Sequence, residues 1–160
     1  MNEPADYAHT QRGPIGLLLV GLGMTFGALS IGPNGEEPLV AMLLLVLAAL
    51  FVMLAFMFQS LFVRVSATGI EARFGPVAIF QRCVSFDQVT TVVRTKSALI
   101  DGLGLHYFPG RGWTWNIWGR DCVELKLHDG GIWRIGSDEA ALLEAALLGR
   151  GVAHEVGSST

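Results

Sequence analysis

The chain has 160 residues, of which 51% are hydrophobic and 16% are charged, and its formal net charge at pH 7 is -3. The length suits one ordinary domain, and the slightly acidic balance excludes nucleic-acid binding through an overall positive charge. The two cysteines, Cys83 and Cys122, stand far apart in the sequence. One disulfide is possible by number alone, but free thiols are expected if both residues face a reducing compartment.

Residues 39–58 form an unbroken run of twenty apolar side chains without a charge. A helix of this length, at about 1.5 Å per residue, crosses the ~30 Å hydrocarbon core of a bilayer. A second apolar stretch, residues 14–31, precedes it and is shorter and richer in glycine. The pattern therefore predicts two transmembrane helices, at about 14–31 and 39–62, within a membrane segment of residues 13–63.

The first apolar stretch has one alternative interpretation, a cleaved signal peptide, because Ala28-Leu29-Ser30 resembles a small-residue cleavage site. A signal peptide begins with a basic leader. The leader of this chain carries Glu3 and Asp6, with Arg12 as its single Lys or Arg. We therefore expect the first helix to be retained.

The charges that flank the two stretches predict an orientation. The turn between them carries Glu36 and Glu37 and no Lys or Arg, whereas Arg12 and Arg64 flank the opposite ends. Lys and Arg near helix ends favour the cytoplasmic side. We predict a multi-pass protein of the inner (cytoplasmic) membrane with both termini in the cytoplasm, in which residues 1–12 form an N-terminal cytoplasmic tail.

Small residues recur every seven positions in both stretches, which indicates a packed helix pair. Small side chains let helix backbones approach closely in lipid, and a seven-residue repeat keeps one seam toward one partner. The spacing could also arise by chance, and the seam could equally face another copy of the chain. The predicted packing residues are Gly16, Gly23, Gly27 and Ser30 in the first helix and Ala41, Ala48 and Ala55 in the second.

After the second stretch, the sequence changes to short alternating segments separated by turn residues. These segments predict about seven strands, at 62–67, 70–74, 77–84, 88–96, 113–118, 122–127 and 132–135. Residues 140–148 favour a helix, which Gly149 is expected to end. The predicted fold is therefore a membrane α-hairpin plus a soluble α+β domain over residues 64–149. That domain is an antiparallel bent sheet or small barrel capped by one C-terminal helix, and a flexible tail, 150–160, follows it.

Four segments carry a resemblance to a known family. They are residues 102–105 (GLGL), 112–119 (GWTWNIWG), 121–125 (DCVEL) and 132–138 (IWRIGSD). Together with the two helices, they resemble the bacterial PH-like domain membrane proteins that carry a two-helix N-terminal membrane hairpin. The likeness covers about residues 61–148 and implies a PH-like fold. It names no chemistry, because these motifs are turns and core strands.

No set of residues in the sequence matches a known catalytic or metal-binding pattern. Cys122, His128 and Asp129 are candidates for a nucleophilic triad, but the length of a strand separates Cys122 from the other two. Zinc requires Cys or His in pairs at short spacing, and here each stands alone. Neither apolar stretch contains an ionisable residue, which argues against a transporter, channel or intramembrane protease. We expect no enzyme activity, no cofactor and no metal.

Residues 106–120 are the most unusual soluble stretch, because they hold three of the four tryptophans between two arginines. The tryptophans could fill the core, since large aromatic side chains are mostly buried. Trp and Arg also favour the bilayer headgroup level and protein interfaces. The candidate lipid or partner contacts are Arg111, Trp113, Trp115, Trp118 and Arg120.

These observations predict a non-catalytic, membrane-anchored scaffold or adaptor that acts through protein or lipid-surface contacts of its soluble domain. The expected partners are the lipid bilayer and other membrane proteins or a second copy of the chain, with no nucleic acid. An accessory subunit of a larger membrane enzyme or assembly complex is the alternative. A sensor of membrane state is a third possibility, for which the sequence offers no specific feature.

Overall fold

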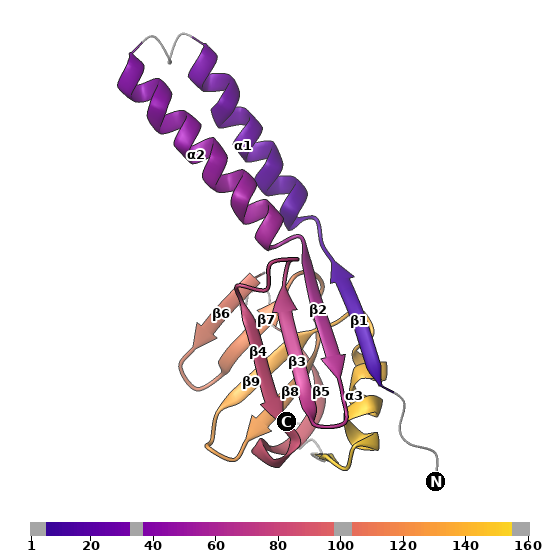
Figure 1. Ribbon diagram of the computed structural model, residues 1–160. Coiled ribbons are helices and arrows are strands. Elements are labelled where there is room, and N and C mark those ends of the chain that lie inside the picture. The colour runs from indigo at the N-terminus through magenta and orange to yellow at the C-terminus, as the bar shows by residue number, and fades with distance from the viewer. Residues whose placement is uncertain (1–5, 33–36, 98–103, 155–160) are drawn as a thin grey trace.

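The computed structural model describes residues 6–32, 37–97 and 104–154, and it shows a helical hairpin that projects from a β-rich domain (Figure 1). The helices are α1 (Ile15–Ile31), α2 (Pro38–Met57) and α3 (Ala140–Gly149), and the 3-10 turn η2 covers Phe86–Gln88. The strands are β1 (Tyr7–Arg12), β2 (Ser60–Val65), β3 (Gly69–Phe74), β4 (Gln81–Ser85), β5 (Val89–Lys96), β6 (Gly104–Phe108), β7 (Gly112–Asn116), β8 (Asp121–Leu127), β9 (Ile132–Gly136) and β10 (Ala153–His154).

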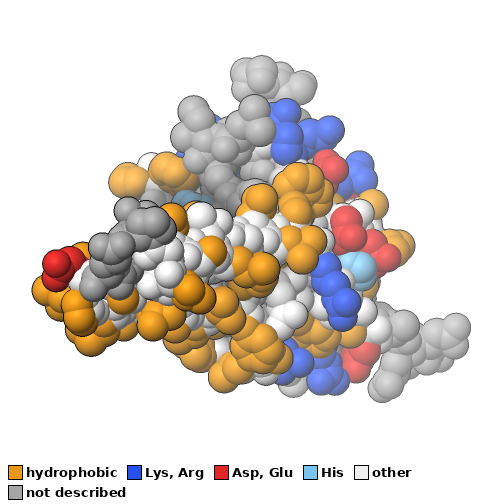
Figure 2. All heavy atoms as spheres, turned by 90° about the horizontal axis from the view of Figure 1, so that it is seen from above, with side chains coloured by type: hydrophobic (Ala, Val, Ile, Leu, Met, Phe, Trp, Pro, Cys, Tyr) orange, Lys and Arg blue, Asp and Glu red, His pale blue; other side chains and the backbone are white. Residues whose placement is uncertain are grey.

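The hairpin exposes its apolar side chains instead of burying them (Figure 2). Ala55 is the one buried residue of the twenty in α2. Within the described ranges, α2 is the one helix long and apolar enough to cross a membrane, judged by length and composition. Helix α1 has 17 residues, the lower end of the range of about 17–25 for a transmembrane helix.

Helix α2 ends five residues earlier than the sequence predicted. The Phe58 N–H bonds to the Leu54 carbonyl as a helical cap, and strand β2 begins at Ser60. Alternate residues of β2 are buried, which is the pattern of a strand with one face on the core. The predicted helix to residue 62 was therefore wrong, because residues 60–62 are apolar enough for either structure and pairing with neighbouring strands decides between them.

The first sheet has the order β1-β2-β3-β4 and is antiparallel throughout. Its outer strand β1 corrects the prediction that residues 1–12 form a tail, because Tyr7 pairs with Val65 and Arg12 pairs with Ser60. The strand was hard to recognise because an edge strand can keep polar side chains on its open face. As a result, the chain enters the hairpin from β1 and leaves it into the adjacent strand β2.

The second sheet has the order β10-β5-β8-β9-β7-β6 and is mixed. Strand β7 runs parallel to β9, and β10 runs parallel to β5, so the predicted all-antiparallel sheet was wrong. The described residues form ten strands rather than about seven; β1, β6 and β10 are the additions. Strand β10 also lies inside the predicted flexible tail, where Arg150 pairs with Asp6 at 2.8 Å.

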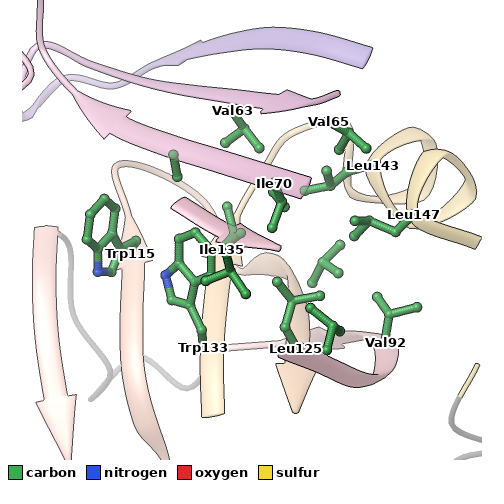
Figure 3. Packing of buried hydrophobic residues seen from close by; sticks show 14 of the residues in the cluster. Val63, Val65, Ile70, Val92, Trp115, Leu125, Trp133, Ile135, Leu143 and Leu147 are labelled. Atoms are coloured by element: carbon green, nitrogen blue, oxygen red, sulfur yellow. The ribbon is translucent and has the colours of Figure 1, made fainter. Parts of the chain in front are cut away.

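The two sheets and α3 enclose a single hydrophobic core (Figure 3). Ile70 comes from the first sheet, Leu125 and Trp133 come from the second, and Leu143 and Leu147 come from α3. Each of these five side chains is at most 1% exposed. The predicted C-terminal helix is therefore confirmed as one cover of an α+β domain.

Candidate membrane and partner interface

The end of the β domain that joins the hairpin forms a distinct surface, which we call the hairpin-proximal rim. Several close contacts between segments far apart in the sequence build it. The Gly75 N–H donates to the Ser60 carbonyl at 2.9 Å, and a side chain on Gly13 would lie 2.7 Å from the Ile117 carbonyl oxygen. The rim consists of Arg12 and Gly13, residues 58–60, the β3–β4 loop at 75–80, and Ile117 and Trp118.

Aromatic packing fixes the β3–β4 loop against the end of α2. The Phe58 ring lies 5.2 Å from the Phe74 ring and 5.6 Å from the Phe80 ring, measured between centroids. Gly75 has a φ of 62°, and a Cβ there would collide with the Met57 carbonyl. The loop is therefore held at the level where the hairpin begins.

This loop presents two large apolar side chains to the outside. Val77 is 60% exposed and Ile79 is 64% exposed. Exposed apolar side chains next to an apolar hairpin form one continuous surface that water solvates poorly. Residues 77–84 had been predicted as one strand, without this loop, since Val and Ile also favour strands.

The three tryptophans of residues 106–120 are placed in three different environments. Trp115 is 5% exposed, and its ring contacts the Trp133 ring at 5.7 Å, so it belongs to the core. Trp118 is 51% exposed and lies at the rim, where its backbone carbonyl accepts a 2.8 Å hydrogen bond from the Gln11 side chain. Trp113 is 40% exposed near the tip of the β6–β7 hairpin. They do not form one patch.

The two arginines of the same stretch also differ in position. Arg111 is exposed in the turn between β6 and β7, where its N–H bonds to the Phe108 carbonyl. Arg120 precedes β8, and its Nε donates to the Ser97 carbonyl at 3.2 Å. The backbone of Ser97 in turn donates to the Arg120 carbonyl at 2.7 Å. Arg120 is therefore tied to the end of β5 and holds two strand ends together.

A hollow of ≈ 530 Å³ opens at the base of the hairpin, between α1 and α2. Arg12 and Gln59 line its domain end, whereas Leu17, Val20 and Phe56 are among the apolar residues higher in the helices. The hollow therefore has a polar floor and apolar walls. Arg12, which served in the sequence only as a guide to orientation, is thus a rim residue.

The predicted packing residues of the hairpin fall into three groups. Gly16 faces Ala55, and Gly23 faces Ala48; a Cβ added to these glycines would lie 3.4 Å and 3.1 Å from the opposing carbonyl oxygens. Gly27 has open space where a side chain would be. The remaining two are Ser30, which is buried and donates to the Gly27 carbonyl at 2.6 Å, and Ala41, which is half-buried.

The groups with catalytic potential do not assemble into a reactive set. Cys122 is fully buried at the start of β8, and His128 and Asp129 lie in the turn after its other end. In the part of the chain that the structure describes, no three His, Cys, Asp or Glu residues gather as a metal site would require.

No protein-family model matches the chain, and no curated protein matches it. Function is therefore inferred from the geometry of the rim and the domain.

Proposed function

We propose that this chain is a membrane-anchored, non-catalytic scaffold or adaptor. Its helical hairpin holds a PH-like domain against the cytoplasmic face of the inner membrane, and the domain acts through lipid and protein contacts. The observation that carries this proposal is the exposure of the apolar hairpin, together with its entry from β1 and its exit into the adjacent strand β2.

The exposure of the hairpin favours lipid as its surroundings. A core helix of a soluble protein buries its apolar side chains, but Leu43 is 58% exposed, Val46 is 62% exposed and Phe56 is 53% exposed. Exposed apolar side chains run along both helices, from Leu17 to Ile31 and from Leu39 to Phe56. Soluble monomers rarely expose contiguous apolar patches of this extent in water. In the hydrocarbon of a bilayer, the hydrophobic effect does not favour burial of these side chains.

The charges favour the cytoplasmic placement of the domain. Arg12 and Arg64 lie on β1 and β2 at or below the base of the hairpin, and Glu37 lies at its tip. Positive charges stay on the cytoplasmic side during insertion. This orientation makes the protein multi-pass, with α1 and α2 both crossing and both termini inside.

The rim then meets the headgroup layer, which supports a role at the lipid surface. Val77, Ile79 and Trp118 are exposed there, and Trp prefers the depth at which one side of its ring is apolar and the other is wet. The paired strands β1 and β2 both lead directly into the hairpin. The remaining surfaces of the domain are thus presented at a fixed distance from the membrane, as a scaffold requires.

The PH-like description is part of the proposal. Strands β2 to β9 form two sheets that face each other across one core, and α3 closes one side of that core. This arrangement agrees with the resemblance carried by residues 112–119 and 132–138.

Membrane integration can be tested by extraction at alkaline pH. The tagged full chain is expected to stay in the membrane pellet after washing with alkaline carbonate. A variant with Val46→Lys and Leu50→Lys should be lost from the pellet or degraded, because each charge near mid-bilayer costs about 2.5–3.5 kcal/mol. The control Ala67→Lys alters an exposed residue of the β domain and should remain in the pellet. Release of the parent chain into the supernatant would contradict the proposal.

An accessory subunit of a larger membrane complex remains the second candidate, and one observation favours it. Tyr107 and Trp113 form an exposed ring pair at the end of the β6–β7 hairpin, and Trp and Tyr are frequent in protein interfaces. Purification in mild detergent distinguishes the two candidates. A stoichiometric enzyme that co-elutes favours the subunit, whereas the chain alone or with itself favours the scaffold.

A further inference from the structure

Strand β4 is an edge of the first sheet, and two hollows open between it and the second sheet. Their volumes are ≈ 310 Å³ and ≈ 460 Å³, and Arg82 and Asp129 line both of them. We call this combined surface the β4 groove. Its lining includes Arg82, Tyr107, Trp113, Gln88, His128 and two carboxylates, Asp87 and Asp129.

Arg82 lies at the centre of the β4 groove. Its guanidinium carbon lies 5.0 Å from the centre of the Trp133 ring, which fixes the side chain by a cation–π contact. Burial lowers the pKa of Arg82, and the charge of Asp129 partly opposes that effect. Among the described residues, Arg82 has no carboxylate within 4 Å and no side-chain hydrogen bond. A partly desolvated guanidinium with unused donors favours an anionic group as ligand.

The backbone of β4 provides a second set of unused groups. In an antiparallel pair, successive residues direct their N–H and C=O alternately toward the neighbour and away from it. The Phe80 carbonyl accepts a hydrogen bond from the Phe74 N–H. The backbone N–H and C=O groups of Gln81, Cys83 and Ser85 therefore point away from β3. The Ser85 N–H is capped by the Gln88 side chain at 3.2 Å. Among the described strands, none pairs with the outward N–H and C=O groups of Gln81 and Cys83, so these groups can pair with another strand.

An aromatic pair provides a third element of the β4 groove. Tyr107 is 58% exposed and Trp113 is 40% exposed, and their rings lie 5.2 Å apart. This pair comes from the β6–β7 hairpin, across the groove from β4. An apolar side chain that packs on the two rings would remove them from water.

We propose that the β4 groove binds an extended peptide segment of a partner protein that carries one Asp or Glu, and that this segment adds as a further strand to β4. The backbone of the segment pairs with Gln81 and Cys83, an Asp or Glu side chain pairs with Arg82, and an apolar side chain packs on Tyr107 and Trp113. Strand pairing provides affinity, and the alternate side chains that enter the groove provide specificity. This inference deepens the proposed scaffold function, because it names the class of partner.

The location of the groove favours a peptide over a lipid headgroup. The β8–β9 turn and the tip of the β6–β7 hairpin line the groove, and both lie away from the helical hairpin (Figure 1). The rim that would face the bilayer meets the groove only at the Gln81 end of β4, through the β3–β4 loop. A segment of a soluble protein, or of the cytoplasmic part of a membrane protein, reaches the groove from the open side.

The test uses the full chain in phosphatidylcholine nanodiscs and a phage library of random dodecapeptides. Enriched peptides are expected to carry an Asp or Glu among strand-forming residues. Arg82→Gln and Tyr107→Ser should each weaken the binding of the synthetic peptides at least about tenfold. The matched control Arg94→Gln, an exposed arginine on β5, should change it less than about twofold. Unchanged melting temperatures show that the variants are folded.

Cys83 gives a second readout that requires no substitution of Arg82. It is exposed on β4, whereas Cys122 is buried, so a maleimide reagent should modify Cys83 selectively. A peptide paired with β4 should slow this alkylation, and a Glu→Gln peptide should protect less. Absence of enrichment, binding that Arg82→Gln leaves intact, or unaltered alkylation would overturn the proposal. Protection by phosphatidylglycerol nanodiscs without peptide would overturn it in favour of a lipid.

The two proposals fail in distinguishable ways. A chain that stays in the alkaline-washed membrane but selects no peptide refutes the β4 groove alone. A chain that binds such peptides but leaves the membrane pellet refutes the anchor alone.

Discussion

Gly23 of α1 lies directly against Ala48 of α2, so that a side chain on Gly23 would be 3.1 Å from the Ala48 carbonyl oxygen. Gly16 lies against Ala55 in the same way, seven residues away along each helix. Continued by one more repeat, this antiparallel register brings Ser30 opposite Ala41. The small residues of this seam let the two backbones approach. The stacked rings of Phe26 and Phe51, 5.5 Å apart, also pack between the helices.

We predict that Gly23→Leu separates the two helices, because the larger side chain meets the backbone of Ala48 and the side chain of Val52. The matched control is Gly27→Leu on the same helix, since nothing lies within 4 Å of its side-chain position. Cysteines at Ser30 and Ala41 should cross-link readily in the parent and in the Gly27 variant and poorly in the Gly23 variant. Equal cross-linking in both variants would show that this seam does not hold the hairpin.

The β3–β4 loop should enter the bilayer interface. An environment-sensitive NBD fluorophore can be attached to Ile79→Cys in a Cys83→Ser background. Its emission maximum is expected at a shorter wavelength in nanodiscs than in the chain unfolded in denaturant without detergent. The same label on Ala67→Cys, an exposed position in the β2–β3 turn, should show the long-wavelength emission of a fluorophore in water. Lipids that carry a quencher near the headgroup should quench the first label and spare the second. Identical emission at the two positions would contradict the placement of the rim.

The core contact of α3 should dominate the stability of the β domain. Leu143 is fully buried, and Leu143→Ala is expected to lower the free energy of unfolding by about 2–5 kcal/mol. Its neighbour Leu142 is 58% exposed, and Leu142→Ala should change it by less than about 0.5 kcal/mol. Thermal unfolding followed by intrinsic tryptophan fluorescence compares the two. A similar loss for both would indicate that α3 packs through another face.

The ion pair between Glu124 and Arg134 joins β8 to β9, with Arg134 Nε and Nη2 both 2.7 Å from Glu124 Oε2. Their side chains are only 12% and 15% exposed, so removal of one partner leaves a charge poorly solvated. We expect Glu124→Ala to destabilise the domain by roughly 3 kcal/mol, and Glu124→Leu with Arg134→Leu to recover most of that loss. If the double variant unfolds as early as the single variant, the pair itself stabilises the sheet.

Long patterns in the sequence predicted their elements well. The run at residues 39–58 and the periodic stretch at residues 140–148 became α2 and α3 with ends shifted by one or a few residues. In both segments most residues favour a helix, so tertiary contacts do not change the local structure. The end of α2 was the exception, because Ser60–Val65 pairs with β3 as a strand.

Features that depend on distant partners were not predictable from local pattern. Tyr7–Arg12 has no apolar alternation, and it becomes a strand because β2 offers an open edge beside it. The tryptophans at 113, 115 and 118 stand close in sequence but separate in space, because the chain turns at both ends of β7 and β7 pairs with both β6 and β9. The β4 groove combines three segments, and no spacing in the sequence relates Arg82 to Tyr107 or Asp129.

The most direct test of the membrane topology is cysteine labelling from one side of the membrane. Spheroplasts that express the chain are treated with a membrane-impermeant maleimide. We predict that Glu37→Cys, in a Cys83→Ser background, is labelled in intact spheroplasts, whereas native Cys83 is labelled only after lysis. Labelling of Cys83 in intact spheroplasts, or of Glu37→Cys only after lysis, would contradict a hairpin that holds the β domain on the cytoplasmic side.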